Sequence, residues 1–465
     1  MKPYQRLLFL GCLGCGVIHG ALFCRAATTP RGTALAAAAS PVFSVAAVVA
    51  GDQNSPTPPV AKAAAAEEGS GGGWEPTRAD NDAETRKGFE HFYSLDYDKA
   101  IRDFEAALKA HPDDPFAVNH LLAAVIFKEL YRIGALDTEA YASDNFLTKK
   151  LQAPLDPAVG QRVKQLTAQA LGLEQALLQK NPDKVNALYA RGATRALQST
   201  YIGLADHAWF SALRNAVAAR HDNERVLQLD PSYVDAKVVV GTHLYIVGSL
   251  SWPVRVAASV AGLSGNKQKG LDYLRQATAS KHVEVATDAR IVLALFLRRE
   301  QKYPEAIEVV NELQHANPRN FLMATEYAHL LNAAGHGPEA IVAYRKVVAG
   351  CPHPSTPTAG AMGAPNRENA YNQCRIQIPA YGLGEALRGQ KDYAMAAEAY
   401  ELAAANSAKD PDLRQKATLA EGEMYDLLQK RDTALEKYKA VIAENSASNS
   451  AELARHYMKQ AYRDP

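Results

Sequence analysis

The chain has 465 residues, of which 47% are hydrophobic and 22% are charged. These proportions are ordinary for a globular protein and exclude wholesale disorder, because enough apolar surface is available to offset the entropy of the chain. Fifty-one basic residues against fifty acidic residues leave a formal charge of +1, which gives no electrostatic footprint for nucleic acid. We therefore expect no DNA or RNA partner.

The first 50 residues are typical of a signal peptide or another membrane-targeting segment. Lys2 and Arg6 form a positive start and are followed by an apolar run over residues 7–23. A second apolar run ends in small side chains at Ala50, and we expect signal peptidase to cleave after Ala50. The first run is then an over-long start, or it is the true apolar region of a signal that is cut earlier.

Two alternatives to a cleaved signal peptide stay open. One is a lipid attached at Cys12 or Cys15, and the other is an uncleaved membrane anchor. We expect an exported chain, periplasmic or extracellular, which these two alternatives would tether to a membrane through its N-terminus. Residues 51–80 follow, with Pro-Thr-Pro-Pro and Gly-Ser-Gly-Gly-Gly stretches and no apolar period, and they predict a disordered linker.

From Gly88 onward the chain repeats a two-helix pattern. A small residue, a large residue and an apolar residue recur with spacings of four and three, as expected for one stripe of a second helix. The five copies of this triplet are Ala100, Phe104, Ala107; Ala306, Val310, Leu313; Ala340, Tyr344, Val347; Ala396, Tyr400, Ala403; and Ala434, Tyr438, Val441. Two adjacent copies, at Ala306 and Ala340, are 34 residues apart.

A helix–turn–helix period of 34 residues with these anchors resembles the tetratricopeptide repeat, or TPR. The resemblance implies an all-α fold, a right-handed α-solenoid of stacked helical hairpins. The chain departs from the family pattern in two places. Glu84 stands where the family has an aromatic residue in the first copy, and Ser446 stands where a proline would close the last copy.

The repeat pattern divides the rest of the chain into four regions. Residues 81–250 are expected to form an N-terminal helical region with degenerate repeats, and residues 251–350 to form regular repeats. Residues 351–378 are predicted to be an insertion loop, and residues 379–465 to hold the C-terminal repeats and a capping helix. Strand signals are nearly absent from all four regions.

The degenerate region is predicted to be helical throughout. The expected helices are Phe116–Ile133, Ala158–Lys180, Val185–Thr200, Leu204–Leu229 and Val234–Leu250. Glu174 and Asn223 stand where the repeat expects an aromatic residue, which predicts longer or rotated helices.

A weaker resemblance covers residues 185–350. Trp252-Pro253, Gly265 and the Gly270–Leu274 motif are similar to the TPR family that contains the inclusion-body-clearance proteins of the mitochondrial outer membrane. Because an exported chain does not share that compartment, this similarity bears only on the fold.

Cys351 and Cys374 are the two cysteines outside the leader, and they bracket most of the insertion loop. In an oxidising compartment this arrangement predicts a disulfide that closes the loop. The alternative is a pair of buried free thiols.

The TPR resemblance also implies a concave groove lined by the first helix of each hairpin. In the family's register, the groove-facing positions are Arg298, Thr325, His329, Asn332, Tyr381, Glu385, Arg388, Glu423 and Asp426. This mixture of aromatic, amide and charged side chains suits a peptide or a helix of a protein partner. We therefore expect a non-catalytic scaffold with no cofactor and no metal, and the oligomeric state stays open.

Two other functions remain as alternatives. One is an enzyme with its active site in the irregular region 131–263, and the other is a membrane-associated assembly or secretion component. An enzyme should show a deep pocket with convergent titratable groups in that region, whereas a scaffold should show a long shallow groove.

Overall fold

The computed structural model describes residues 82–138, 152–252, 255–256, 259, 263–352, 371 and 373–464. Within these residues it contains seventeen α-helices and no β-strand, which confirms the expected all-α fold. The predicted targeting segment with Cys12 and Cys15, the linker over residues 51–80 and most of the 351–378 loop lie outside the described residues.

The helices have the following bounds. They are α1 (Ala83–Tyr93), α2 (Tyr97–Ala110), α3 (Pro115–Arg132), α4 (Pro157–Lys180), α5 (Val185–Leu204), α6 (Trp209–Leu229), α7 (Ala236–Ser249), α9 (Lys267–Ala277), α10 (Val283–Arg299), α11 (Tyr303–Ala316), α12 (Phe321–Ala333), α13 (Gly337–Gly350), α14 (Gln377–Gly389), α15 (Tyr393–Ala405), α16 (Pro411–Leu427), α17 (Arg431–Glu444) and α18 (Asn449–Lys459).

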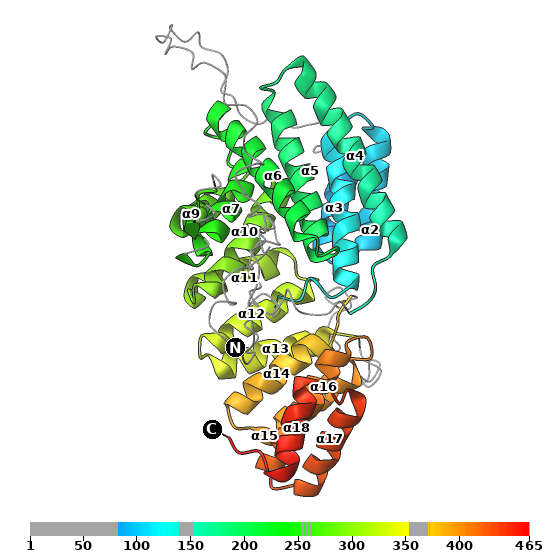
Figure 1. The fold of residues 1–465 in the computed structure, drawn as a ribbon, viewed down its shortest axis with the longest axis vertical. Helices are drawn as coiled ribbons and strands as arrows, with labels where there is room; N and C mark the ends of the chain where they lie inside the picture. Colours follow the sequence, from blue (N-terminus) through cyan, green and yellow to red (C-terminus); the bar gives the residue numbers. More distant parts are fainter. Residues whose placement is uncertain are drawn as a thin grey trace, which may run out of the picture. The chain divides into compact units, whose positions relative to one another are not determined.

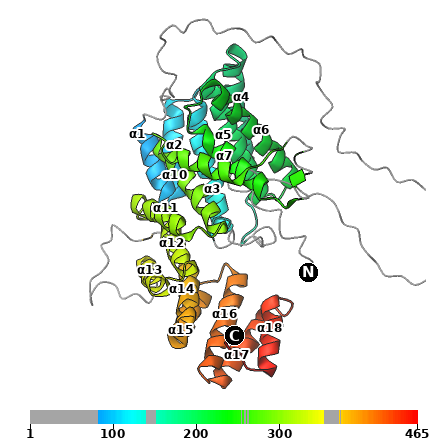
Figure 2. The same cartoon turned by 90° about the vertical axis from the view of Figure 1, so that its left-hand side faces the viewer.

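Each helix packs against the next helix in the chain (Figure 1). Alternate helices also touch, as α12 touches α14 and α16 touches α18. Figure 2 shows α14 to α18 as successive hairpins laid side by side. Contacts between neighbours in sequence are what an α-solenoid requires, because each hairpin buries its apolar stripe only against the next one.

The predicted triplets form the core of the regular hairpins. All fifteen side chains of the five triplets are buried. Each second helix begins three residues before its small residue, as α2 begins at Tyr97 and α11 begins at Tyr303. Tyr97, Tyr303 and Tyr393, which the pattern placed in the turn, are therefore the first residues of their helices.

The five hairpin turns share one backbone feature. A residue with positive φ lies two positions before each second helix, at Leu95, Gln301, Gly335, Lys391 and Gln429. This left-handed conformation reverses the chain in few residues and accounts for the constant spacing between the two helices.

A close contact between the two helices holds each hairpin together. A Cβ atom added at Gly384 would lie 2.5 Å from the ring of Tyr400, and one added at Gly422 would lie 2.7 Å from the ring of Tyr438. Gly88 faces the ring of Phe104 in the same way. The helix backbones approach so closely that the aromatic ring occupies the space of the missing side chain.

The α5–α6 hairpin keeps this contact in a longer form. Gly192 faces Asn223, which lies 31 residues later in the chain, whereas Gly384 and Tyr400 are 16 residues apart. The prediction of longer helices is confirmed, since α5 has 20 residues and α6 has 21. The predicted start of α6 at Leu204 is wrong, because the chain turns at His207, which has a φ of 52°.

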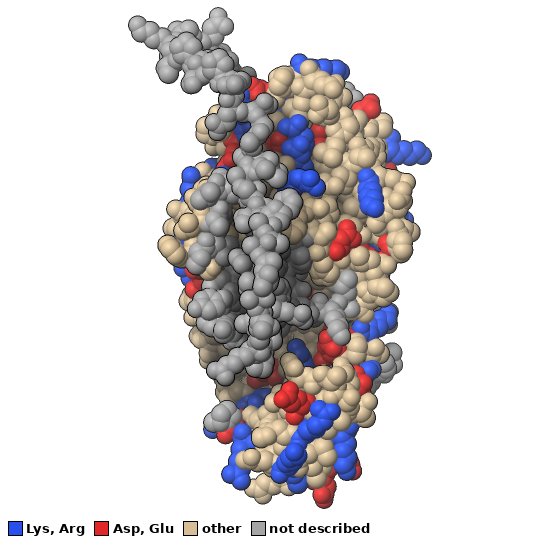
Figure 3. Space-filling view, in the orientation of Figure 1, with Lys and Arg blue, Asp and Glu red and all other residues tan. Residues whose placement is uncertain are grey.

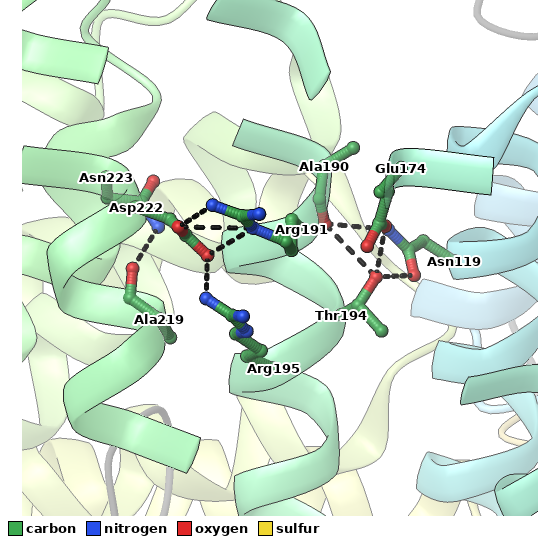
Figure 4. Close-up of polar contacts among 9 residues, drawn as sticks. All are labelled: Asn119, Glu174, Ala190, Arg191, Thr194, Arg195, Ala219, Asp222 and Asn223. Carbon is green, nitrogen blue, oxygen red and sulfur yellow. Dashed lines mark hydrogen bonds and ion pairs between the residues drawn. The ribbon is translucent and has the colours of Figure 1, made fainter. Parts of the chain in front are cut away.

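Polar residues form a buried network among α3, α4, α5 and α6 (Figure 4). The Oγ1 atom of Thr194 lies 2.5 Å from Glu174 Oε1 and 2.8 Å from Asn119 Oδ1. Burial raises the pKa of Glu174 to about 7, although the hydrogen bond with Thr194 opposes this rise. On the other side of α5, Arg191 and Arg195 both bind Asp222, at 2.6 and 2.5 Å.

The predicted insertion separates α13 from α14. The structure joins Cys351 and Cys374 by a disulfide whose Cα atoms are 5.4 Å apart. Beside it, the guanidinium of Arg375 stacks on the ring of Tyr131, 4.2 Å from the ring centroid, and Arg375 Nη1 donates to Gln152 Oε1 at 2.9 Å. The end of the segment is thus anchored on α3 and on the chain that follows it.

The apolar helix α7 has only 14 residues. Among the helices that the structure describes, none is both long enough and apolar enough to cross a membrane. The preference for a helix of the solenoid core over residues 238–254 agrees with this finding.

Candidate functional site

The predicted groove residues lie on four first helices and form two clusters. The α10–α12 cluster contains Arg298, Thr325, His329 and Asn332. The α14–α16 cluster contains Tyr381, Glu385, Arg388, Glu423 and Asp426. In both clusters an ion pair joins one first helix to the next, so each cluster lies on one continuous face of the hairpins.

Glu326 is the centre of the α10–α12 cluster, although the sequence did not single it out. Its carboxylate lies 2.8 Å from Arg298 Nη1 and 3.5 Å from His329 Nδ1, and it accepts a 2.7 Å hydrogen bond from Thr138 Oγ1. Burial alone would raise the pKa of Glu326, but the charge of Arg298 and the contacts with His329 and Thr138 hold that pKa below its usual value. Arg298 and His329 therefore serve the packing of α10 against α12.

The N-terminal hairpin covers much of this cluster. Tyr93 at the end of α1 donates from its hydroxyl to Asp288 Oδ1 on α10 at 2.9 Å. Asn320, at the start of α12, donates from Nδ2 to the carbonyl oxygen of Tyr93 at 2.8 Å. Thr325 is only 1% exposed and donates to the Phe321 carbonyl of its own helix. The expectation that Thr325 faces an open groove is wrong, whereas Asn332 is half-buried at the far end of α12.

A cavity of about 130 Å³ remains where the N-terminal hairpin meets α10, α11 and α12. Apolar side chains of these helices supply most of its lining. Its two acids are Asp288, which binds Tyr93, and Glu326, which binds Arg298. Burial raises the pKa of Asp288 to about 7, with the Tyr93 hydrogen bond opposing the rise. Both acids already have partners within the chain.

The α14–α16 cluster combines aromatic rings with ion pairs. The rings of Tyr381 and Tyr400 have centroids 5.5 Å apart, and the Tyr400 hydroxyl donates to Glu385 Oε1 at 2.6 Å. Arg388 Nη1 donates to Glu423 Oε2 at 3.0 Å. Burial raises the pKa of Glu423 to about 7, although the charge of Arg388 opposes this rise.

Asp426 is the most rigidly held member of the α14–α16 cluster. Arg431 Nη1 lies 2.8 Å from both carboxylate oxygens, and the Tyr438 hydroxyl donates to Oδ2 at 2.8 Å. The backbone N–H of Tyr462 donates to the same oxygen at 2.8 Å. Asp426 is therefore not open to solvent, because residues 460–464 lie over it.

Sequence reasoning did not find Arg431 or Tyr462. Arg431 begins a second helix, a position that the groove register does not include. Tyr462 follows the capping helix α18 and has no hairpin of its own to pack in, which was the available signal that it contacts another part of the chain.

Charges of both signs are interspersed over the surface visible in Figure 3. On that face the described residues form no broad patch of one sign. This distribution agrees with the near-neutral composition and favours partners recognised by individual side chains over a uniformly charged polymer.

Residues 257–321 match a family model described as "Tetratricopeptide repeat". The chain contains tetratricopeptide repeats. TPR proteins are generally scaffolds for protein interactions, and their stacked hairpins provide extended binding surfaces. No curated protein matches this chain.

Several solved TPR structures are similar to this chain at low sequence identity. The Cut9 complex with Hcn1, an APC/C hetero-tetramer, has a matched chain that is 12% identical with a TM-score of 0.42, and the match covers 83% of this chain and 56% of that one. Yeast Tom70 is 12% identical with a TM-score of 0.34, covering 81% of this chain and 87% of that one. A tetratricopeptide repeat protein from Parabacteroides merdae is 14% identical with a TM-score of 0.29, covering 74% of this chain and 99% of that one.

The raised pKa of Asp288 predicts a pH dependence of stability. Its ordinary pKa in an unfolded chain is about 3.9, so between about pH 4 and pH 7 the unfolded state loses this proton while the folded state keeps it. The free energy of unfolding should therefore fall as the pH rises through this window, by up to about 3 kcal/mol between pH 5 and pH 7 from this group. Asp288→Asn, which keeps an acceptor for Tyr93, should reduce that fall in urea unfolding curves at the two pH values.

Glu174 and Glu423 contribute in the same direction, so Asp288→Asn should remove only part of the fall. Asp412→Asn, at an exposed position in the first turn of α16, is the control and should leave the pH dependence unchanged. An Asp288→Asn chain with the same pH dependence as the unsubstituted chain would show that Asp288 is ionised in the folded protein.

Proposed function

We propose that this protein is a non-catalytic scaffold that holds a protein or peptide partner against the first-helix face of its repeats. TPR hairpins support this proposal, because stacking them produces a surface much longer than one helix. The observation that carries it is the position of residues 460–464, which already lie across α14 and α16. That face therefore offers the donors and acceptors that an extended peptide needs.

The proposal that the scaffold is non-catalytic rests on how its buried acids are used. Asp288 and Glu326 border the cavity but already bind Tyr93 and Arg298. Glu174 is enclosed by Thr194 and Asn119 in the α3–α6 network. A general acid or base has to reach a proton of its substrate, and these carboxyl groups are directed at side chains of the protein itself.

Site-specific photo-crosslinking tests the proposed binding face. Asn332 lies half-buried on the first helix α12, whereas Val342 is 67% exposed on the second helix α13. With benzoylphenylalanine in place of Asn332, irradiation in the native cell should give a discrete adduct to a partner protein. The same residue in place of Val342 should give none, because second helices lie on the opposite face. Adducts formed equally well from both positions would contradict the proposal.

We further propose that the protein is exported and that its leader is removed after Ala50. Lys2, Arg6 and the apolar run over residues 7–23 support export, as does the pairing of Cys351 with Cys374. The mature chain should therefore begin at Gly51 by mass spectrometry, and a non-reducing peptide map should recover the two cysteines in one linked pair. Closing a loop with a sequence separation of 23 should stabilise the fold by about 3 kcal/mol, so reduction should lower the urea midpoint.

Lys2→Glu combined with Arg6→Glu is the matched variant, and it should leave the leader attached. A lipid mass at Cys12 or Cys15, or an uncut leader in a membrane fraction, would replace the soluble form with a tethered one. A mature chain that keeps residues 1–50 in a soluble fraction, with both thiols free, would contradict export.

A further inference from the structure

We propose that the α14–α16 face is a binding site for an extended peptide carrying a tyrosine and, two residues later, an acid, and that residues 460–464 occupy it as an internal ligand. This inference rests on the function proposed above and names the kind of partner that the face would take. It is carried by three contacts that this segment makes with residues of α14, α15 and α16.

The first contact reads the peptide backbone. Beyond α18 the chain becomes extended, with φ −136° and ψ 115° at Gln460. The N–H of Tyr462 then donates to Asp426 Oδ2 at 2.8 Å. Asp426 is held in place by Arg431 and Tyr438 whether or not the segment is present, so its carboxylate is prepared to accept an N–H from any extended chain.

The second contact reads the tyrosine side chain. Arg388 Nη2 lies 2.5 Å from the Tyr462 hydroxyl, and the guanidinium carbon lies 5.3 Å from the centroid of the ring. The ring of Tyr457 packs edge-on against the same ring, with centroids 5.2 Å apart. Glu423 fixes Arg388 from the other side at 3.0 Å. An arginine held in this way favours an aromatic ring that also carries a polar group.

The third contact reads the acid. The Tyr393 hydroxyl donates to Asp464 Oδ2 at 2.9 Å. Ala461, Arg463 and Asp464 are exposed, so the segment is attached mainly through Tyr462 and one carboxylate. A segment with so few buried side chains can be displaced by a partner peptide with the same two groups, because such a peptide would form the same contacts.

A fluorescent peptide with the sequence of residues 459–464, capped at both ends, tests the site by anisotropy. The full chain carrying Tyr462→Ala and Asp464→Ala should bind it at least tenfold more tightly than the unsubstituted chain, in which the internal segment competes. Adding Arg388→Gln to the double variant should weaken binding at least tenfold. A peptide with alanine in place of its tyrosine should not bind.

Arg463→Ala is the matched control, because Arg463 is exposed in the same segment, and this variant should behave like the unsubstituted chain. Equal binding to the double variant and to the unsubstituted chain would overturn the proposal, as would no binding to a double variant that is folded by circular dichroism. The second result would mean that residues 460–464 only cap the last hairpin.

A measurement on the unsubstituted chain covers the case in which the double variant does not fold. Millimolar peptide should increase deuterium uptake of residues 460–464 in hydrogen-exchange mass spectrometry, with little change in α2 or α3. Unchanged uptake would overturn the proposal. If the peptide fails while Asn332 still gives a partner adduct, the scaffold function stands without this site. If the peptide binds but Asn332 gives no adduct, the site stands and the wider scaffold proposal falls.

Discussion

The contact between a small residue of one helix and a large side chain of the next determines the rest of this structure. Gly88 against Phe104 and Gly422 against Tyr438 bring two helix backbones so close that a single methyl group would overlap the ring. Since this distance is fixed, the apolar stripe of each hairpin faces the next hairpin at the same angle. Asn223 against Gly192 keeps the close approach in a hairpin whose helices are much longer.

The first-helix face that this stacking creates is partly covered by the chain itself. Tyr93 and Asn320 join the N-terminal hairpin to α10 and α12, and Tyr462 lies on α14 and α16. Both covering segments are held by hydrogen bonds to polar side chains of the first helices. The same side chains define what a partner must offer, namely aromatic groups with a polar end, carboxylates and backbone N–H groups.

The repeat could be predicted from sequence because it depends on residues close together in the chain. The spacing of Ala306, Val310 and Leu313 gives the buried stripe of α11, and the 34-residue period gives the next hairpin. The register also placed Arg298 and Arg388 on first helices. It could not show that Thr325 and Asp426 are covered, because the segments that cover them are distant in sequence or lie beyond the last repeat. Glu326 and Tyr462 were missed for the same reason.

A double-mutant cycle at Gly88 and Phe104 tests most directly whether the small-to-large contact sets the hairpin geometry. Val310 faces Ala294 at the equivalent positions of the α10–α11 hairpin, so Gly88→Ala with Phe104→Val copies a pair that the chain already uses. Alone, Gly88→Ala should lower the free energy of unfolding by about 1–3 kcal/mol, as overpacking does. In the Phe104→Val background it should be neutral or raise that free energy by up to about 1 kcal/mol, as expected for Gly172→Ala, where nothing lies within 4 Å of the added carbon. An equal loss in both backgrounds would contradict the account.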